Sequence, residues 1–101
     1  MPKGYWIGRV DVSNPEAYGK YVAANAAAFA KYGARFLVRA GRYEALEGTT
    51  RSRHVVLEFA DYETALACYH SPEYAAAKAL REGHALADMV VVEGYDGPQP
   101  G

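Results

Sequence analysis

The chain has 101 residues, half of them apolar, and a formal net charge of −1 at pH 7. A chain of this length forms one domain and buries only about two-thirds of its unfolded surface, so its core is small. Its 11 basic residues are spread along the sequence, which argues against a nucleic-acid-binding protein. No apolar run has the length of a membrane span, and the N-terminus lacks the apolar core of a signal peptide. We therefore expect a cytoplasmic protein that does not bind membranes.

Few residues of the chain are suited to binding a metal. The single cysteine, Cys68, excludes an internal disulfide and is consistent with a reducing compartment. The histidines stand at positions 54, 70 and 84, a spacing that matches no metal or haem motif. We therefore expect a protein without metal or cofactor.

The chain begins with a predicted strand and a long helix. Side chains of residues 5–12 alternate with the two-residue period of a β-strand. A helix is predicted over residues 15–32, because Asn14 or the serine before it can cap the helix, Pro15 suits its first turn, and tyrosines and apolar residues recur every three or four positions. Gly33 supplies the left-handed conformation that ends such a helix.

Two further strands are predicted to pair as a hairpin. Residues 34–40 alternate again, and residues 43–47 can continue this strand beyond a bend at Gly41. A polar turn at residues 48–50 leads into the third strand, over residues 53–60.

A proline divides the helical region that follows. Asp61 caps a helix predicted over residues 62–70, and Pro72 forces a break after it. Ser71 then caps a new helical segment that runs to residue 81 or 82. We interpret the Ser71 hydroxyl as a cap and not as a nucleophile, because no Ser-His-Asp arrangement accompanies it.

The chain ends in an apolar strand and a tail. Residues 85–93 form a continuous apolar run, whereas residues 94–101 are rich in glycine and proline and are expected to hold no regular structure. We expect one domain over residues 1–95 and a flexible tail over residues 96–101.

The predicted order β-α-β-β-α-β defines an α+β, ferredoxin-like fold: a four-stranded antiparallel sheet in the order 4-1-3-2, with the helices on one face. No element is left to cover the other face, although each strand carries apolar residues on both sides. The residues left uncovered are Ile7, Leu37, Val56 and either Val90 or Val91. Such a face predicts a homodimer, in which a second copy related by a two-fold axis covers it.

Alternation also places charged residues on the uncovered face. By this count the face carries Arg9, Asp11, Arg39 and Glu58, with Glu58 between the two arginines. The favoured interpretation is an ion-pair network across strands and across the dimer. The alternative is that one of the arginines binds an anion.

A candidate pocket is predicted between the helices and the sheet. Tyr74, Arg81 and His84 follow one another at seven- and three-residue steps along one helical face, and the first helix turns tyrosines and an asparagine toward the first strand. An arginine beside phenols suits a ligand with a carboxylate or enolate, and the histidines are conceivable acids or bases. The entrance is predicted near His70 and Tyr74. The candidate residues are Trp6, Tyr18, Tyr21, Asn25, Tyr69, His70, Tyr74, Arg81 and His84.

Several stretches resemble a known family. They are residues 3–7 (KGYWI), 31–39 (KYGARFLVR), 46–48 (LEG) and the block 69–74 (YHSPEY) with Arg81. They resemble the bacterial domain-of-unknown-function family 1330, which is similar in fold to the dimeric α+β barrel proteins. That superfamily includes cofactor-independent monooxygenases, muconolactone isomerases and haem-binding proteins; the motifs of the last two do not map onto this sequence. The resemblance implies the fold and a homodimer, and leaves the chemistry open.

Two hypotheses of function follow. In the first, each subunit binds a small, anionic aromatic molecule, and converts it without cofactor if it is an enzyme. In the second, the protein is a non-catalytic dimeric binding or interaction module whose cleft is filled by its own tyrosines. A cavity of about 300 Å³ or more would favour the first, because this is the lower range for ligand sites.

Overall fold

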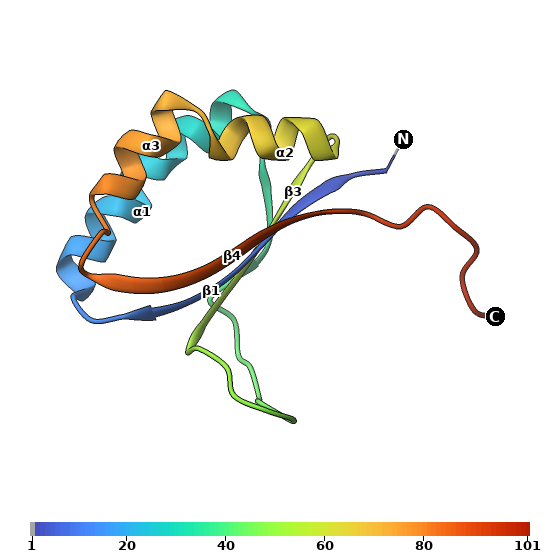
Figure 1. Cartoon of the computed structure of the whole chain (residues 1–101), viewed down its shortest axis with the longest axis horizontal. Coiled ribbons are helices and arrows are strands. Elements are labelled where there is room, and N and C mark those ends of the chain that lie inside the picture. Colours follow the sequence, from blue (N-terminus) through green and yellow to red (C-terminus); the bar gives the residue numbers. More distant parts are fainter. Residues whose placement is uncertain (1) are drawn as a thin grey trace.

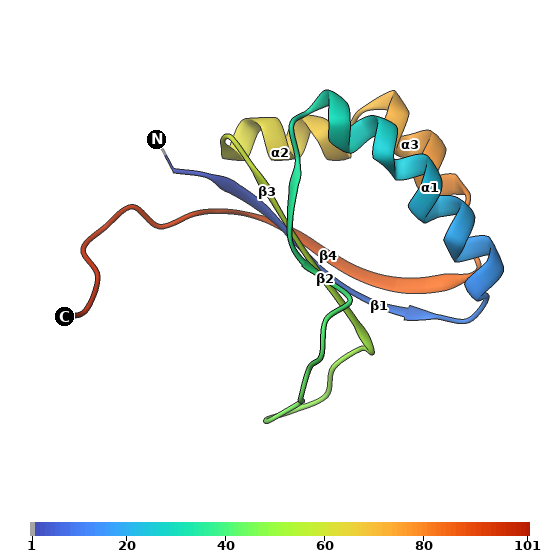
Figure 2. The same cartoon turned by 180° about the vertical axis from the view of Figure 1, so that it is seen from behind.

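The computed structural model describes residues 2–101, which form four strands and three helices around one sheet. The elements are β1 (Gly4–Val12), α1 (Pro15–Lys31), β2 (Arg35–Arg39), β3 (Arg53–Phe59), α2 (Tyr62–Tyr69), α3 (Pro72–Ala79) and β4 (Ala85–Glu93). The strands are antiparallel in the order β2-β3-β1-β4, and all the helices lie on one side of the sheet (Figures 1 and 2). The predicted ferredoxin-like fold and sheet order are confirmed.

Local sequence signals account for the ends of the helices. The Asn14 side chain accepts a hydrogen bond from the Ala17 backbone N–H (3.1 Å), and Asp61 caps α2 in the same way. Gly33 has the positive φ, 67°, that was predicted for the end of α1. Helix α3 ends at Ala79, two or three residues earlier than predicted, and a turn leads from there to β4.

The predicted continuation of β2 over residues 43–47 is wrong. Residues 40–50 leave the sheet as an exposed loop that projects away from the helices (Figure 1). The chain turns at Ala40, which has a φ of 55°, and not at Gly41. The Ala40 N–H donates to the His54 carbonyl (2.8 Å), so the hairpin closes before the loop begins.

A β-bulge in β2 changes which face one arginine occupies. Phe36 pairs with Leu57 and Val38 pairs with Val56, so Leu37 is an extra residue without a partner on β3. Beyond the bulge, Arg39 pairs with Val55, and Val55 belongs to the face that the helices cover. The prediction that Arg39 lies on the uncovered face is therefore wrong: one inserted residue reverses the alternation.

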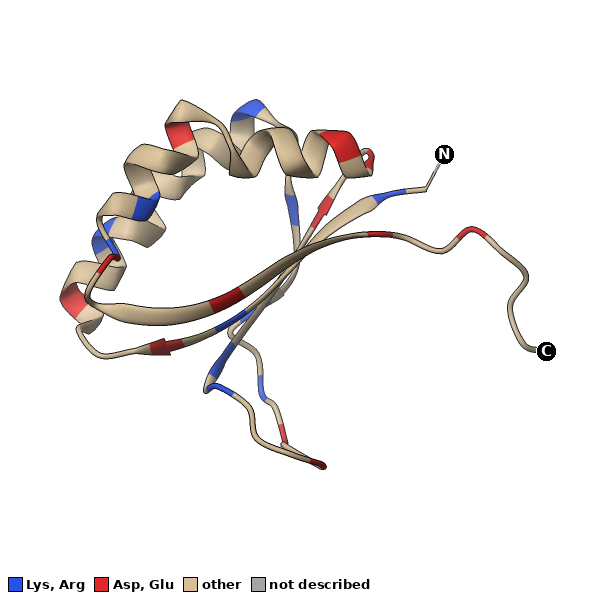
Figure 3. Ribbon diagram, in the orientation of Figure 1, with Lys and Arg blue, Asp and Glu red and all other residues tan. Residues whose placement is uncertain are grey.

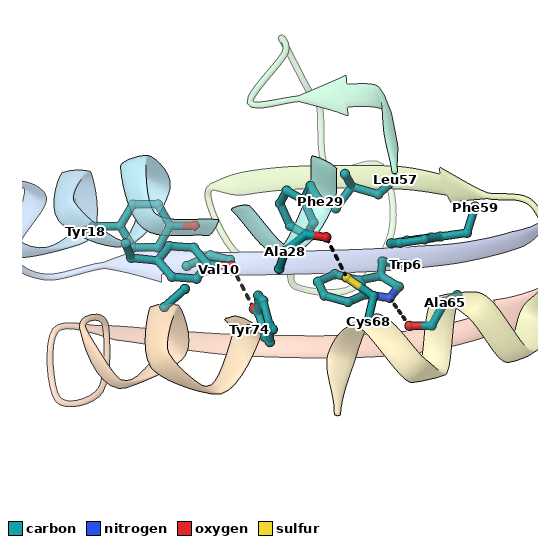
Figure 4. Close-up of a cluster of buried hydrophobic side chains, with 12 residues drawn as sticks. Trp6, Val10, Tyr18, Ala28, Phe29, Leu57, Phe59, Ala65, Cys68 and Tyr74 are labelled. Carbon is teal, nitrogen blue, oxygen red and sulfur yellow. Dashed lines mark hydrogen bonds between the residues drawn. The ribbon is translucent and has the colours of Figure 1, made fainter. Parts of the chain in front are cut away.

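Trp6 is the centre of the core (Figure 4). It is 1% exposed, and its ring lies 4.9–5.6 Å from the rings of Phe29, Phe59, Tyr69 and Tyr74. The indole N–H donates to the Ala65 carbonyl on α2 (2.8 Å), so the polar atom of the side chain is satisfied. A single side chain thus joins β1 to every helix.

Cys68 is also fully buried, and its Sγ lies 3.8 Å from the Ala28 carbonyl oxygen. Burial raises the pKa of the Cys68 thiol to about 12, so it stays protonated at neutral pH. The buried thiol links α2 to α1 as part of the core.

Ser71 caps α3 from a buried position. Its Oγ accepts from the Tyr74 N–H (3.1 Å) and donates to the Cys68 carbonyl (2.7 Å). We expect Ser71→Ala to lower the free energy of unfolding by about 1–2 kcal/mol, because both polar groups lose their partner in a dry site. Urea unfolding of this variant and of Asn14→Ala, whose cap is exposed, measures the difference. A larger loss for Asn14→Ala would contradict the burial argument.

The face of the sheet opposite the helices carries exposed apolar side chains. Ile7 is 40% exposed and Val90, its partner on β4, is 52% exposed. Val91 pairs with the buried Trp6 and faces the helices, which decides the alternative that the sequence left open. Leu37 is exposed as well, whereas Val56 is half-buried.

The charges on this face are arranged differently from the prediction. Arg51 binds the carboxylates of Asp11 (2.9 Å) and Asp88 (2.8 Å), and it is Tyr5 that donates to Glu58 (3.4 Å). The backbone N–H of Ser52 and the Arg51 guanidinium hold the pKa of Asp11 below its usual range. Figure 3 shows Lys and Arg interspersed with Asp and Glu along helices and strands.

Within residues 2–101, no helix is long and apolar enough to cross a membrane. The same residues hold no group of three or more His, Cys, Asp or Glu side chains that could bind a metal ion.

Candidate functional site

A small cavity lies between the sheet, α1 and the turn that follows α3. Rings and aliphatic side chains form most of its wall. The lining residues are Trp6, Gly8, Val10, Tyr18, Tyr21, Val22, Asn25, Phe29, Phe36, Arg39, Arg53, Val55, Leu57, Arg81, Ala87 and Met89. Its volume is about 30 Å³, room for about one water molecule, so a larger ligand enters only when side chains at its edge move aside.

The inner end of the site is a chain of hydrogen-bonding groups on α1 and α3. The hydroxyls of Tyr21 and Tyr74 are 2.7 Å apart, and Arg81 Nη2 lies 3.5 Å from the Tyr74 hydroxyl. The Arg81 guanidinium also stands over the Tyr21 ring, 5.2 Å from its centroid. Burial, reinforced by the neighbouring Tyr74, raises the pKa of Tyr21 far above its usual range, so its phenol stays neutral and can donate a hydrogen bond.

Arg53 contributes a second cation, from the start of β3. It pairs with Val10 on β1, which places it on the helix-covered face, and its guanidinium lies 5.2 Å from the centroid of the Tyr18 ring. Its Nε is buried and has no hydrogen-bond partner. Desolvation raises the pKa of Tyr18, even though the positive charge of Arg53 acts in the opposite direction.

Arg39 contributes a third cation, at the edge of the cavity. Its guanidinium lies 4.1 Å from the centroid of the Phe36 ring, and Phe36 packs edge-on against Phe29 of α1. Unlike Arg81, Arg39 is exposed to solvent. The Arg39 side chain therefore lies at the border of the site, where it stacks over the Phe36 ring.

Within residues 2–101, none of these arginines forms an ion pair with a carboxylate. In the described part of the chain, the ion pairs are those of Lys31 with Glu73 and of Arg51 with Asp11 and Asp88. The lining contains neither aspartate nor glutamate. The cavity is thus an apolar, aromatic space bordered by three positive charges.

The structure brings together only part of the predicted pocket. Trp6, Tyr18, Tyr21, Asn25 and Arg81 line the cavity, as listed above. Tyr74 adjoins it through the Tyr21 hydroxyl, whereas Tyr69 packs behind the Trp6 ring.

The two predicted histidines lie elsewhere. The His70 side chain is exposed and contacts the Tyr69 ring, and His84 is half-buried in the turn before β4, where its carbonyl accepts from the Ser13 N–H (2.9 Å). The entrance predicted near His70 is wrong, because the cavity extends along β1 toward Val10 instead.

Sequence reasoning left Arg53 out of the site and placed Arg39 on the uncovered face instead of in the pocket. Arg53 shares the two-residue period of Val55, Leu57 and Phe59, so the alternation itself assigned it to the covered face. Arg39 carried no comparable signal, because its face depends on the bulge at Leu37.

Comparison with known proteins places the chain in a family. The family model described as "Domain of unknown function (DUF1330)" matches residues 3–95. The chain belongs to the DUF1330 family. This confirms the resemblance seen in the sequence. No curated protein matches this DUF1330 protein.

Solved structures confirm the fold at low sequence identity. A protein of unknown function from Rhodopseudomonas palustris has a TM-score of 0.74 and 14% identity, over 95% of this chain and 85% of that one. A dimeric ferredoxin-like protein of unknown function from Bacteroides fragilis has a TM-score of 0.62 and 15% identity, over 90% and 95%. SnoaB, a cofactor-independent oxygenase from Streptomyces nogalater, has a TM-score of 0.59 and 14% identity, over 99% and 97%.

Proposed function

We propose that this DUF1330 protein is a homodimer in which each subunit binds a small, anionic, aromatic molecule between α1, α3 and the sheet. One observation carries the proposal: Arg39, Arg53 and Arg81 border an aromatic cavity that contains no carboxylate. A guanidinium can hold two oxygens of a carboxylate at once.

The Arg81 side chain is buried, with 8% of its surface exposed. Removing a charge from water costs several kcal/mol by general estimates, and a single long hydrogen bond to a neutral phenol recovers little of this cost. A bound carboxylate would supply both the missing charge and the missing acceptors. The surrounding rings favour a flat, apolar body for the ligand.

Conversion of the ligand is a second step that the same groups can support. A neutral Tyr21 phenol and the Arg81 guanidinium are donors that stabilise negative charge on an oxygen, such as that of an enolate. Product formation from a bound aromatic acid, in the absence of metal or cofactor, distinguishes an enzyme from a binding protein.

The uncovered face of the sheet is the proposed dimer interface. Ile7, Leu37 and Val90 expose apolar surface that a second copy would bury. The structural relative from Bacteroides fragilis is itself described as dimeric.

The non-catalytic module remains the second candidate, favoured by the cavity volume of about 30 Å³. In that case the tyrosine and arginine side chains fill the cleft, and no small molecule displaces them. The binding experiment decides between the two candidates.

The test is calorimetric titration with a panel of small aromatic carboxylates that includes benzoate. We expect binding to the wild type, and binding about 10–100-fold weaker to Arg81→Met, because charge-assisted hydrogen bonds are worth roughly 1.5–3 kcal/mol. Lys20→Gln removes one positive charge from an exposed position on α1 and serves as the matched control, with unchanged affinity expected. Thermal unfolding shows whether each variant is folded. If no aromatic acid binds the folded wild type, the proposed ligand class is wrong.

A further inference from the structure

The arginines of the cavity stand on two different walls. Arg81 comes from the turn that follows α3 and lies over Tyr21 of α1, in the helical layer. Arg39 and Arg53 come from β2 and β3, in the sheet layer. Building on the proposed function, we propose that the ligand is a dianion: one anionic group binds Arg81, and the second binds Arg39 and Arg53 together.

The sheet arginines form a pair by register. Arg39 lies opposite Val55, and Arg53 is two residues from Val55 along β3, on the same face. The two arginines are therefore diagonal cross-strand neighbours, a relation in which Cα atoms are roughly 7–8 Å apart and long side chains still meet. Arg39 lies over the Phe36 ring and Arg53 beside the Tyr18 ring, and both line the cavity, so the two guanidinium groups can share one carboxylate once Arg39 turns from Phe36 toward Arg53.

No carboxylate in residues 2–101 forms an ion pair with either member of this pair. Neither arginine belongs to any of the ion pairs, and the Arg53 Nε is a buried donor without an acceptor. Like charges at neighbouring positions of a sheet destabilise it, and a buried N–H donor without an acceptor adds to the cost. A second anionic group accounts for both observations, whereas a ligand with one carboxylate on Arg81 accounts for neither.

The bulge in β2 creates this second subsite, because it places Arg39 on the same face of the sheet as Arg53. Without the extra residue at Leu37, Arg39 would point to the uncovered face and Arg53 would stand alone. The stacking of Arg39 on Phe36 then holds its guanidinium at the edge of the cavity. Because Arg39 is exposed, it can also swing aside to enlarge a cavity that has room for about one water molecule in this conformation.

The experiment compares a dianion with a monoanion of the same ring. Benzoate and benzene-1,3-dicarboxylate are titrated by calorimetry, at one ionic strength, into the wild type, Arg39→Gln, Arg53→Gln and Lys20→Gln. We expect the wild type to bind the dicarboxylate about 10-fold or more tightly than benzoate, since one additional charge-assisted contact is worth about this factor. Arg39→Gln and Arg53→Gln should each weaken binding of the dicarboxylate more than binding of benzoate and so remove that preference, and Lys20→Gln should keep it.

Arg39→Gln is the decisive variant, because the side chain is exposed and stacks on the Phe36 ring at the edge of the cavity. The second subsite is wrong if the wild type binds both acids equally, or if Arg39→Gln weakens the binding of both by the same factor. In either case, binding of benzoate still supports the proposed function. If the wild type binds neither acid, both proposals fail.

Discussion

Replacing Trp6 by alanine is expected to lower the free energy of unfolding by about 3–5 kcal/mol, the range for large aromatic residues removed from a core. The side chain is 1% exposed, contacts aromatic rings from β3 and all three helices, and satisfies the Ala65 carbonyl. Its removal leaves a cavity beside β1 and one carbonyl without its donor. Urea unfolding followed by far-UV circular dichroism measures the loss, because the variant has no tryptophan fluorescence.

Trp6→Phe is the control for this prediction. Phenylalanine keeps an aromatic ring in the cluster and removes only the indole N–H and part of the volume, so a loss of about 1–2 kcal/mol is expected. Equal stability of Trp6→Ala and the wild type would contradict the packing derived for this core. If Trp6→Ala does not fold, the Phe variant still measures the donor to Ala65.

Replacing Val90 by aspartate is expected to convert the proposed homodimer into a monomer. Val90 is 52% exposed and pairs with Ile7 in the middle of the uncovered face, where the two-fold axis would bring a second sheet against it. A carboxylate buried there without a partner costs several kcal/mol in each subunit, enough to weaken the dimer by two or more orders of magnitude. Light scattering at micromolar concentration should report about twice the chain mass of 11.0 kDa for the wild type and about the chain mass for the variant.

Ala26→Asp is the matched control, since it introduces the same charge on the exposed side of α1. It should remain a dimer. A monomeric wild type would contradict the dimer directly. If Val90→Asp stays dimeric and folded, the interface lies somewhere other than the uncovered face.

The sequence by itself was sufficient to predict the features that depend on a few neighbouring residues. The strand over residues 85–93, the Asn14 cap, the left-handed Gly33 and the break before Pro72 all appear as predicted, because each depends on a few neighbouring residues. The sheet order follows from the element order, since the ferredoxin-like connections leave few alternatives. About half of the candidate site was predictable from periodicity within single elements. The helical and strand periods place the following residues on the sides that face the space between helices and sheet: Trp6, Tyr18, Tyr21, Asn25 and Arg81.

Only the tertiary structure decided the charge and the size of the site. The face that Arg39 occupies depends on the pairing of Phe36 with Leu57 and of Val38 with Val56, a register between two strands that no local pattern in β2 encodes. The position of His84 depends on where α3 ends, and the cavity volume depends on how side chains from five elements pack together. Alternation is a property of one strand, whereas a bulge and a cavity are properties of several segments in contact. For this reason the place of Arg39 in the site became visible only in the folded chain.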